Sequence, residues 1–262
     1  MEAALRQPNM TDVYEGVLVP AIFAPWSAEL IERARPIGPS DRILDLGCGT
    51  GIVARKLRER LGGAAAITGL DASAEMIGKA RELAPELTWH EGNAMSLPFP
   101  DASFELVVCQ QMLQFVPDRA VALREIRRAL VRGGRLVLAT WRPRHELALY
   151  EAIGRVAERH LGVPNEKRFA LGDDGELRAL ISDAGFSDVV VEVISRTESF
   201  KEFPFRLSAL AANFDLSDLP DEERERRLQA VESESIEASK PFVAGGKIEA
   251  TSRANIVTAV AK

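Results

Sequence analysis

The sequence ILDLGCGTG, residues 43–51, places a short apolar run directly before three alternating glycines. The apolar run suits a strand buried on both faces, and glycine tolerates backbone angles that are closed to other residues. Residues 52–61 then carry apolar positions at helical spacing, and the glycine pair at 62–63 predicts the end of that helix. The glycines therefore lie at a strand-to-helix turn, where free N–H groups at the helix start are expected to face a ligand.

The spacing of these glycines separates three classes of cofactor site. A Walker phosphate loop needs Gly-Lys-Ser/Thr, and no lysine follows here. The dinucleotide pattern Gly-x-Gly-x-x-Gly would place its third glycine at Ile52. The turn is instead Gly-x-Gly-x-Gly, and LDLGCGTG resembles the first motif of the class I S-adenosylmethionine-dependent methyltransferases. The resemblance implies S-adenosylmethionine as cofactor, held by Asp45, Gly47, Cys48 and Gly49.

A second acid follows at the tip of the next expected strand, residues 66–71. A carboxylate at the position of Asp71 accepts hydrogen bonds from ribose hydroxyls; the alternative is that Asp71 serves only the turn. Ser73 is the predicted N-cap of a helix over residues 74–83. The resemblance implies that Ala72 and Met76 line the adenine, although Met76 would equally suit the core.

Two further stretches match the family by position. Residues 92–94 read Gly-Asn-Ala where relatives usually show Gly-Asp-Ala. Asn93, with Ala94 beside it, can still accept a bond from the adenine amino group, and its amide can also donate. Residues 104–111 are the expected fourth strand, and the resemblance assigns the main-chain carbonyl of Gln110 to the methionine ammonium.

The pattern of elements predicts an α/β fold. Strands alternate with helices as far as residue 140, including a helix over 118–131, a glycine stop at 133–134 and a fifth strand over 135–140. Such alternation indicates a parallel sheet with helices on both faces. The resemblance adds a doubly wound, Rossmann-like sheet of seven strands that is mostly parallel, with the last strand antiparallel.

After residue 140 the pattern is looser. It predicts helices over 145–161, 173–184, 200–219 and 220–240, and strands over 187–194 and 252–260. The charged runs in the last of these helices suit solvated faces. The expected domains are N-terminal lid helices (1–40), a cofactor-binding methyltransferase core (41–196 and 247–262) and a helical cap insertion (197–246).

Composition excludes several classes of protein. The chain has 262 residues, a formal net charge of −6 and two cysteines. The acidic balance provides no field for a nucleic-acid backbone, and the fourth strand ends in CQQM rather than in the Asn/Asp-Pro-Pro-aromatic signature of base-amine methylation. Cys48 and Cys109 lack metal-ligand spacing, so no metal is expected. No run approaches a membrane span, which favours a cytoplasmic protein; a homodimer is compatible with this reading.

The chemistry expected of such a site is in-line displacement of a methyl group onto a small-molecule acceptor. The resemblance is greatest to the branch that includes quinone-biosynthesis and other small-molecule methyltransferases. Acceptors should lie beyond the carboxyl ends of strands four and five, under the N-terminal segment. The candidate substrate contacts are Tyr14, Trp26, Gln111, Gln114, Trp141 and Arg142.

His145 is the candidate general base, because it directly follows the fifth strand and an imidazole suits proton removal at neutral pH. The alternative is an exposed residue at a helix start beside Arg144 and Glu146.

Two other functions stay open. Asp71 alone would permit a dinucleotide oxidoreductase, against which Ile52 argues. A non-methylating regulator or cyclase would carry the same cofactor motifs.

Overall fold

A computed structural model describes residues 10–63, 65–162, 167–201, 203–205 and 220–262 of the chain. Its strands follow the order β3-β2-β1-β4-β5-β8-β6 in one sheet, and a short β7 pairs with β8. The sheet strands are β1 (Arg42–Leu46), β2 (Ala66–Asp71), β3 (Thr88–Glu91), β4 (Phe104–Gln110), β5 (Leu130–Trp141), β6 (Phe186–Phe200), β7 (Val243–Ala244) and β8 (Lys247–Ala261).

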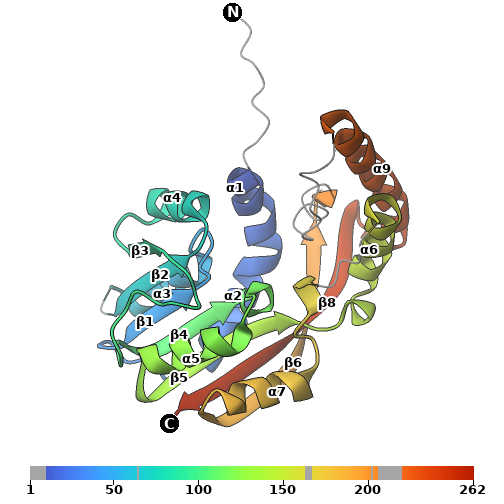
Figure 1. The fold of residues 1–262 in the computed structure, drawn as a ribbon. Helices are drawn as coiled ribbons and strands as arrows, with labels where there is room; N and C mark the ends of the chain where they lie inside the picture. The colour runs from blue at the N-terminus through green and yellow to red at the C-terminus, as the bar shows by residue number, and fades with distance from the viewer. Residues whose placement is uncertain (1–9, 64, 163–166, 202, 206–219) are drawn as a thin grey trace, which may run out of the picture. The chain divides into compact units, whose positions relative to one another are not determined.

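The first five strands are parallel and set the place of the site. β1 pairs with β2 on one side, with Leu46 opposite Leu70, and with β4 on the other, with Asp45 opposite Val108. β2 pairs with β3, and β4 with β5. The strand order therefore reverses between β1 and β4, and a doubly wound sheet binds ligands at the carboxyl ends of its strands beside such a reversal. Figure 1 shows these strands side by side.

β8 runs against β6. The Ser187 hydroxyl near the start of β6 meets the carbonyl of Val260 near the end of β8, whereas Glu198 late in β6 bonds Ser252 early in β8. Partners that ascend in one strand and descend in the other define an antiparallel pair. The expected sheet of mostly parallel strands with an antiparallel last strand is confirmed.

Helices connect the strands. They are α1 (Met10–Val13), α2 (Ala24–Arg33), α3 (Ile52–Leu61), α4 (Ala74–Leu83), α5 (Arg119–Ala129), α6 (Ala148–Leu161), α7 (Asp174–Asp183) and α9 (Asp221–Ser239). Short helical turns are η2 (Leu113–Phe115), η3 (Arg144–Glu146), η4 (Lys167–Phe169) and η5 (Lys240–Phe242). Within the described ranges, no helix combines the length and apolar character that a bilayer crossing requires.

The segment between α1 and α2 is helical with wider hydrogen bonding. η1 (Tyr14–Phe23) is a π-helix, and the Ala24 N–H bonds the carbonyl of Val19, five residues back. Pro20 lies inside it and cannot donate a backbone bond. Helical widening of this kind is rare and frequently marks functional sites.

Several boundaries differ from the sequence prediction. α5 ends at Ala129 and not at residue 131, because Leu130 already has extended backbone angles and opens β5. The predicted glycine stop lies inside that strand, where Gly133 has a φ of +77° and the β4–β5 register shifts; a glycine with positive φ is the usual means of such a bulge.

In the second half of the chain the strands are longer than predicted, and the β7–β8 hairpin was not predicted. α6 begins at Ala148, after the η3 turn that contains His145. The helix predicted over 220–240 is confirmed as α9. The helix predicted over 200–219 lies mainly outside the described residues, and Phe200 itself closes β6.

The chain divides into two compact units. The first comprises Met1–Ala139, Arg178–Val191 and Ile256–Lys262, and the second comprises Thr140–Leu177 and Glu192–Asn255. In the first unit, the core lies between the helices and β1, β2 and β4, where Leu44, Leu57 and Leu106 are fully buried. In the second unit α6 and α9 lie side by side (Figure 1), and Arg159 pairs with Glu234 at 2.8 Å.

Candidate cofactor site

The three glycines of the turn serve different purposes. All have positive φ, from +54° to +85°. A Cβ at Gly47 would lie 2.2 Å from the Met112 side chain, and one at Gly51 would lie 2.2 Å from the Trp89 ring. A Cβ at Gly49 would come no closer than 3.2 Å, to the hydroxyl of Tyr14. Two glycines therefore admit side chains from other elements, and at the buried Gly49 a Cβ would press against the Tyr14 hydroxyl.

The backbone of the turn is held largely from within. Gly47 and Cys48 donate to the carbonyl of Leu70, at 2.7 and 3.1 Å, and Gly51 donates to Cys48. The Gly49 N–H donates to an Asp71 oxygen at 2.8 Å. The expectation of free N–H groups at these four positions is therefore wrong, because the neighbouring strand β2 satisfies three of them. What Gly49 offers a ligand is close approach rather than a donor.

Asp71 links the tips of two strands. One carboxylate oxygen accepts from Gly49 and the other accepts from the N–H of Ser73 at 2.9 Å. Ser73 in turn caps α4, accepting from the Met76 N–H at 3.3 Å, so its predicted N-cap role is confirmed. Each carboxylate oxygen retains a second lone pair, and Asp71 is half-buried. Asp71 thus serves the turn and keeps acceptor capacity for a ligand; Ala72 is exposed and Met76 half-buried beside it.

Asp45 is the buried acid of the turn. It is 1 % exposed, and one of its oxygens accepts from the Ala54 N–H at 2.9 Å. Its other oxygen has no hydrogen-bond partner among the described residues. Burial raises the pKa of Asp45 to about 7, and the nearby charge of Asp71 acts in the same direction. A buried carboxyl with an unsatisfied oxygen is the kind of group that a cationic or donor ligand would stabilise.

Tyr14 closes the turn from the N-terminal helix. Its ring stacks on Phe23 with centroids 5.0 Å apart. Burial, followed by the charge of Asp71, raises the pKa of the Tyr14 hydroxyl, which therefore stays protonated. The adjacent Glu15 pairs with Arg55 of α3 at 2.7 Å. The Glu15–Arg55 pair joins η1 to α3, the helix that follows the glycine turn. The lid role of the N-terminal helices stays a prediction.

The carboxyl end of β4 carries three buried glutamines. Gln110 donates from its side chain to the carbonyl of Phe23 at 2.9 Å. Gln111 has a φ of +55°, which is unusual for a residue other than glycine. Gln114, in η2, donates to the Gln111 carbonyl oxygen at 3.1 Å. The two predicted acceptor contacts, Gln111 and Gln114, are therefore in direct contact.

The remaining predicted residues of this unit are placed as follows. Asn93 is exposed, and its carbonyl oxygen already accepts from the Met95 N–H at 2.9 Å, while Ala94 is buried. Trp26 is fully buried in α2, as a packing residue would be. Burial raises the pKa of the Cys48 thiol, and raises that of Cys109 to about 12, so neither is poised as a nucleophile.

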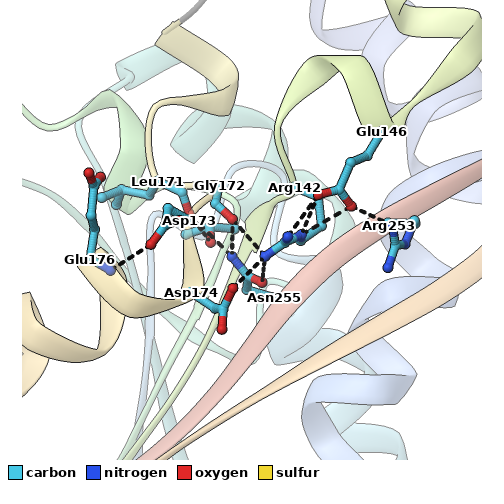
Figure 2. Close-up of polar contacts among 10 residues, drawn as sticks. Arg142, Glu146, Leu171, Gly172, Asp173, Asp174, Glu176, Arg253 and Asn255 are labelled. Atoms are coloured by element: carbon cyan, nitrogen blue, oxygen red, sulfur yellow. Dashed lines mark hydrogen bonds and ion pairs between the residues drawn. The ribbon is translucent and has the colours of Figure 1, made fainter.

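In the second unit, Arg142 is held by the protein itself (Figure 2). It pairs with Glu146 at 2.7 Å and with Asp174 at 3.0 Å, and it also bonds the side-chain oxygen of Asn255 at 3.2 Å. Glu146 is further bonded by Arg253. The Arg142 guanidinium is thus bonded to Glu146, four residues further on, and to two residues distant in the sequence, Asp174 and Asn255. Its role as a substrate contact stays a prediction.

Trp141 is buried at the end of β5, and His145 is exposed in η3. The exposed position is the one expected from the alternative in which His145 is only a surface residue.

Sequence reasoning missed a buried polar cluster in the same unit. Glu198 is 2 % exposed and accepts from the Tyr150 hydroxyl at 2.8 Å and from the Ser252 hydroxyl at 2.5 Å. Burial and the Glu198 charge raise the pKa of Tyr150. The three residues lie on α6, β6 and β8, so no spacing in the sequence could have grouped them.

The strand order and the glycine turn define the class of the core. Residues 44–138 match the family described as a methyltransferase domain. This part of the chain is similar to the class I S-adenosylmethionine-dependent methyltransferases.

Two curated methyltransferases are similar to this chain in sequence. The chain is 36% identical, over 129 residues, to a ubiquinone/menaquinone biosynthesis C-methyltransferase of Xanthomonas campestris, covering 47% of this chain and 51% of the relative. It is 34% identical over 194 residues to a malonyl-[acyl-carrier protein] O-methyltransferase of Halorhodospira halophila, covering 70% and 62%. The chain thus spans about half the length of the first of these curated relatives.

Solved structures agree on the fold. The YcgJ protein of Bacillus subtilis superposes with a TM-score of 0.59 at 20% identity, covering 91% of this chain and 99% of that one. The [4+2]-cyclase SpnF superposes with a TM-score of 0.56 at 25% identity, covering 90% and 80%.

Proposed function

We propose that this protein transfers a methyl group from S-adenosylmethionine to a small-molecule acceptor. The observation that carries the proposal is the glycine turn at the reversal of the strand order, with Asp71 bonded to its backbone and Tyr14 lying against Gly49. The methyltransferase match over residues 44–138 supports the same reaction class.

The residues present fit the cofactor. The absence of a Cβ at Gly49 would allow close approach of the cofactor's ribose and methionine parts, and the spare lone pairs of Asp71 would accept from ribose hydroxyls. The unsatisfied oxygen of Asp45 belongs to β1, two residues before Gly47. On the resemblance, Ala72, Met76, Asn93 and Ala94 would lie along the adenine, and the carbonyl of Gln110 would accept from the ammonium.

When bound, the cofactor supplies an electrophilic methyl group on a sulfonium, so the protein's share of catalysis is positioning and exclusion of water. In this chain Tyr14 and η1 cover the turn, and Gln110 ties the end of β4 to η1 through the Phe23 carbonyl. Gln111 and Gln114 are proposed to orient the acceptor. His145 is the candidate to take up the acceptor's proton where that acceptor needs one removed.

The acceptor proposed is small and partly apolar. A net charge of −6 disfavours nucleic acid, and the relatives named above act on small molecules or a carrier-bound acid. A cytoplasmic location and a homodimeric assembly complete the proposal, and light scattering on the purified protein tests the assembly.

Calorimetry with S-adenosylmethionine, S-adenosylhomocysteine and NAD tests the cofactor. We expect binding of the first two and not of NAD. Gly49→Val places a branched side chain between the turn and Tyr14, where the cofactor is proposed to lie, and should abolish binding while the fold persists. Gly62→Ala is the matched control, because Gly62 also has positive φ but faces open space. Tight NAD binding without a response to S-adenosylmethionine would refute the proposal.

Asp71→Ala should cost about 1.5–3 kcal/mol of cofactor affinity, the usual scale for a hydrogen bond to a charged group. Because Asp71 also holds the turn, its unfolding free energy is measured alongside. Unchanged cofactor affinity would mean that Asp71 only stabilises the turn.

Methyl transfer itself is tested by mass spectrometry of candidate acceptors incubated with cofactor bearing a labelled methyl group. Label in the product establishes transfer. A rearranged product without label would favour the non-methylating alternative, which the similarity to the [4+2]-cyclase keeps relevant.

A further inference from the structure

The contact between Gln111 and Gln114 leaves polar atoms buried and unpaired. The two residues are 6 % and 1 % exposed. Their one mutual bond uses the Gln114 amide nitrogen and the Gln111 oxygen. The Gln111 amide nitrogen and the Gln114 oxygen have no hydrogen-bond partner in the part of the chain that the structure describes. The pair therefore presents one free donor group and one free acceptor.

The presence of one unpaired donor and one unpaired acceptor does not depend on how the two amides are oriented. If both amides are rotated by half a turn, the Gln111 nitrogen donates to the Gln114 oxygen. The Gln111 oxygen and the Gln114 nitrogen are then left unpaired. In either arrangement the pair offers one donor and one acceptor, and it carries no charge.

Keeping these groups unpaired is costly to the fold. A buried amide group without a partner destabilises the fold, and the left-handed backbone of Gln111 adds strain. Folded proteins tolerate such unpaired polar atoms and backbone strain mainly at functional sites, where a ligand can bond to the unpaired atoms. The pair lies at the carboxyl end of β4, next to Met112, whose side chain fills the space left by Gly47 of the cofactor turn.

We propose that Gln111 and Gln114 together select an acceptor that bears a neutral hydroxyl group. One hydroxyl oxygen can accept from the amide nitrogen of one glutamine while its proton is donated to the oxygen of the other. A carboxylate would accept from the nitrogen but be repelled by the free oxygen. An ammonium would meet the converse conflict at the free nitrogen. A neutral hydroxyl satisfies both atoms.

The surroundings of the pair favour an apolar body on that acceptor. Leu113 and Phe115 come from the same short turn as Gln114, and Phe115 is 40 % exposed. Residues 110–116 contain neither acids nor bases, and the Arg119 guanidinium donates to the main-chain carbonyl of Gln114 at 3.2 Å. The inference rests on the proposed function, and it specifies which acceptors that function accepts.

The experiment uses four compounds of matched size, namely benzyl alcohol, benzoate, benzylammonium and toluene. Their binding to the full chain saturated with S-adenosylhomocysteine is measured by ligand-observed NMR at neutral pH. We expect benzyl alcohol to bind more tightly than the other three. Gln111→Met and Gln114→Met should each weaken benzyl alcohol about tenfold, as loss of one such bond does, and should leave toluene within about twofold.

Thermal unfolding gives a second readout. If the two glutamines served only to stabilise the fold, replacing both would lower Tm. The Gln111→Met/Gln114→Met double variant removes both unpaired atoms along with the bond between the side chains, so its Tm should equal or exceed that of the unaltered protein. Thr140→Val is the control: Thr140 is fully buried and its hydroxyl is satisfied by the carbonyl of Leu171 at 2.9 Å. That variant should lower Tm.

The outcomes distinguish failure of this inference from failure of the proposed function. Binding of S-adenosylhomocysteine with unchanged benzyl alcohol affinity in both single variants would overturn this inference alone. A preference for benzoate or benzylammonium over benzyl alcohol, or a lowered Tm in the double variant, would do the same. Failure of the unaltered protein to bind S-adenosylhomocysteine would overturn the proposed function together with the inference.

Discussion

Replacing Asp45 by asparagine should change how the stability of this protein depends on pH. Asp45 is 1 % exposed, and burial raises its pKa from an ordinary value of 3.8 to about 7. In the unfolded chain the carboxyl would regain its ordinary pKa. Between about pH 4 and pH 7 the folded protein therefore holds a proton that the unfolded chain has released, and the free energy of unfolding falls as the pH rises through this window.

The magnitude follows from the two pKa values. From about pH 5 to pH 8 the protein crosses roughly two of the three pKa units that separate folded and unfolded Asp45, and each unit corresponds to about 1.36 kcal/mol. Ionisation of this one group should therefore lower the free energy of unfolding by about 3 kcal/mol over that range. Asp45→Asn keeps the shape and an oxygen for the Ala54 N–H, and it removes the titration.

Urea unfolding followed by circular dichroism at pH 5, 6, 7 and 8, without cofactor, measures the effect. The difference in unfolding free energy between Asp45→Asn and the unaltered protein should shift in favour of the variant by about 3 kcal/mol across the series. Asp188→Asn, which removes an exposed carboxylate, is the control and should track the unaltered protein. Parallel pH profiles for Asp45→Asn and the unaltered protein would refute the reasoning.

Three further predictions concern other parts of the chain. Gly51→Ala should lower the free energy of unfolding, measured by urea titration, by about 2 kcal/mol or more, because its Cβ meets the Trp89 ring at 2.2 Å. Gly62→Ala, with open space around its Cβ, should lower that free energy by only about 1 kcal/mol. Equal losses in the two variants would contradict this account. Arg142→Lys should lower the unfolding free energy by about 2 kcal/mol, since an ammonium cannot reproduce the forked contacts of the guanidinium. Its affinity for S-adenosylhomocysteine, measured by calorimetry, should stay within about twofold. Weakened binding with unchanged stability would indicate that Arg142 contacts a ligand. His145→Ala should reduce turnover roughly 10²–10⁴-fold if the imidazole removes the acceptor's proton, with a smaller loss at higher pH, and near-normal turnover at pH 7 would assign this residue to the surface.

Elements whose signals are local were predicted well from sequence. The strand before the glycine turn, the helix after it and the cap supplied by Ser73 depend on a few consecutive residues, and the structure confirms each. The end of α5 was misplaced because Gly133 and its neighbour signal a helix stop and a strand bulge equally well. Only pairing with β4, which shifts register there, decides between the two.

The sequence by itself also predicts the place and general nature of the site, since glycine spacing and a following acid are constraints that a nearby ligand imposes on neighbouring residues. The tertiary structure decided what each residue does there. Gly47 and Gly51 admit Met112 and Trp89, whereas Gly49 lies against the Tyr14 hydroxyl. Arg142 meets Asn255 from the far end of the chain. The unpaired amides of Gln111 and Gln114 appear only once burial is known. The physical reason is that burial, pairing and steric room depend on contacts between segments distant in sequence, which local propensity does not encode.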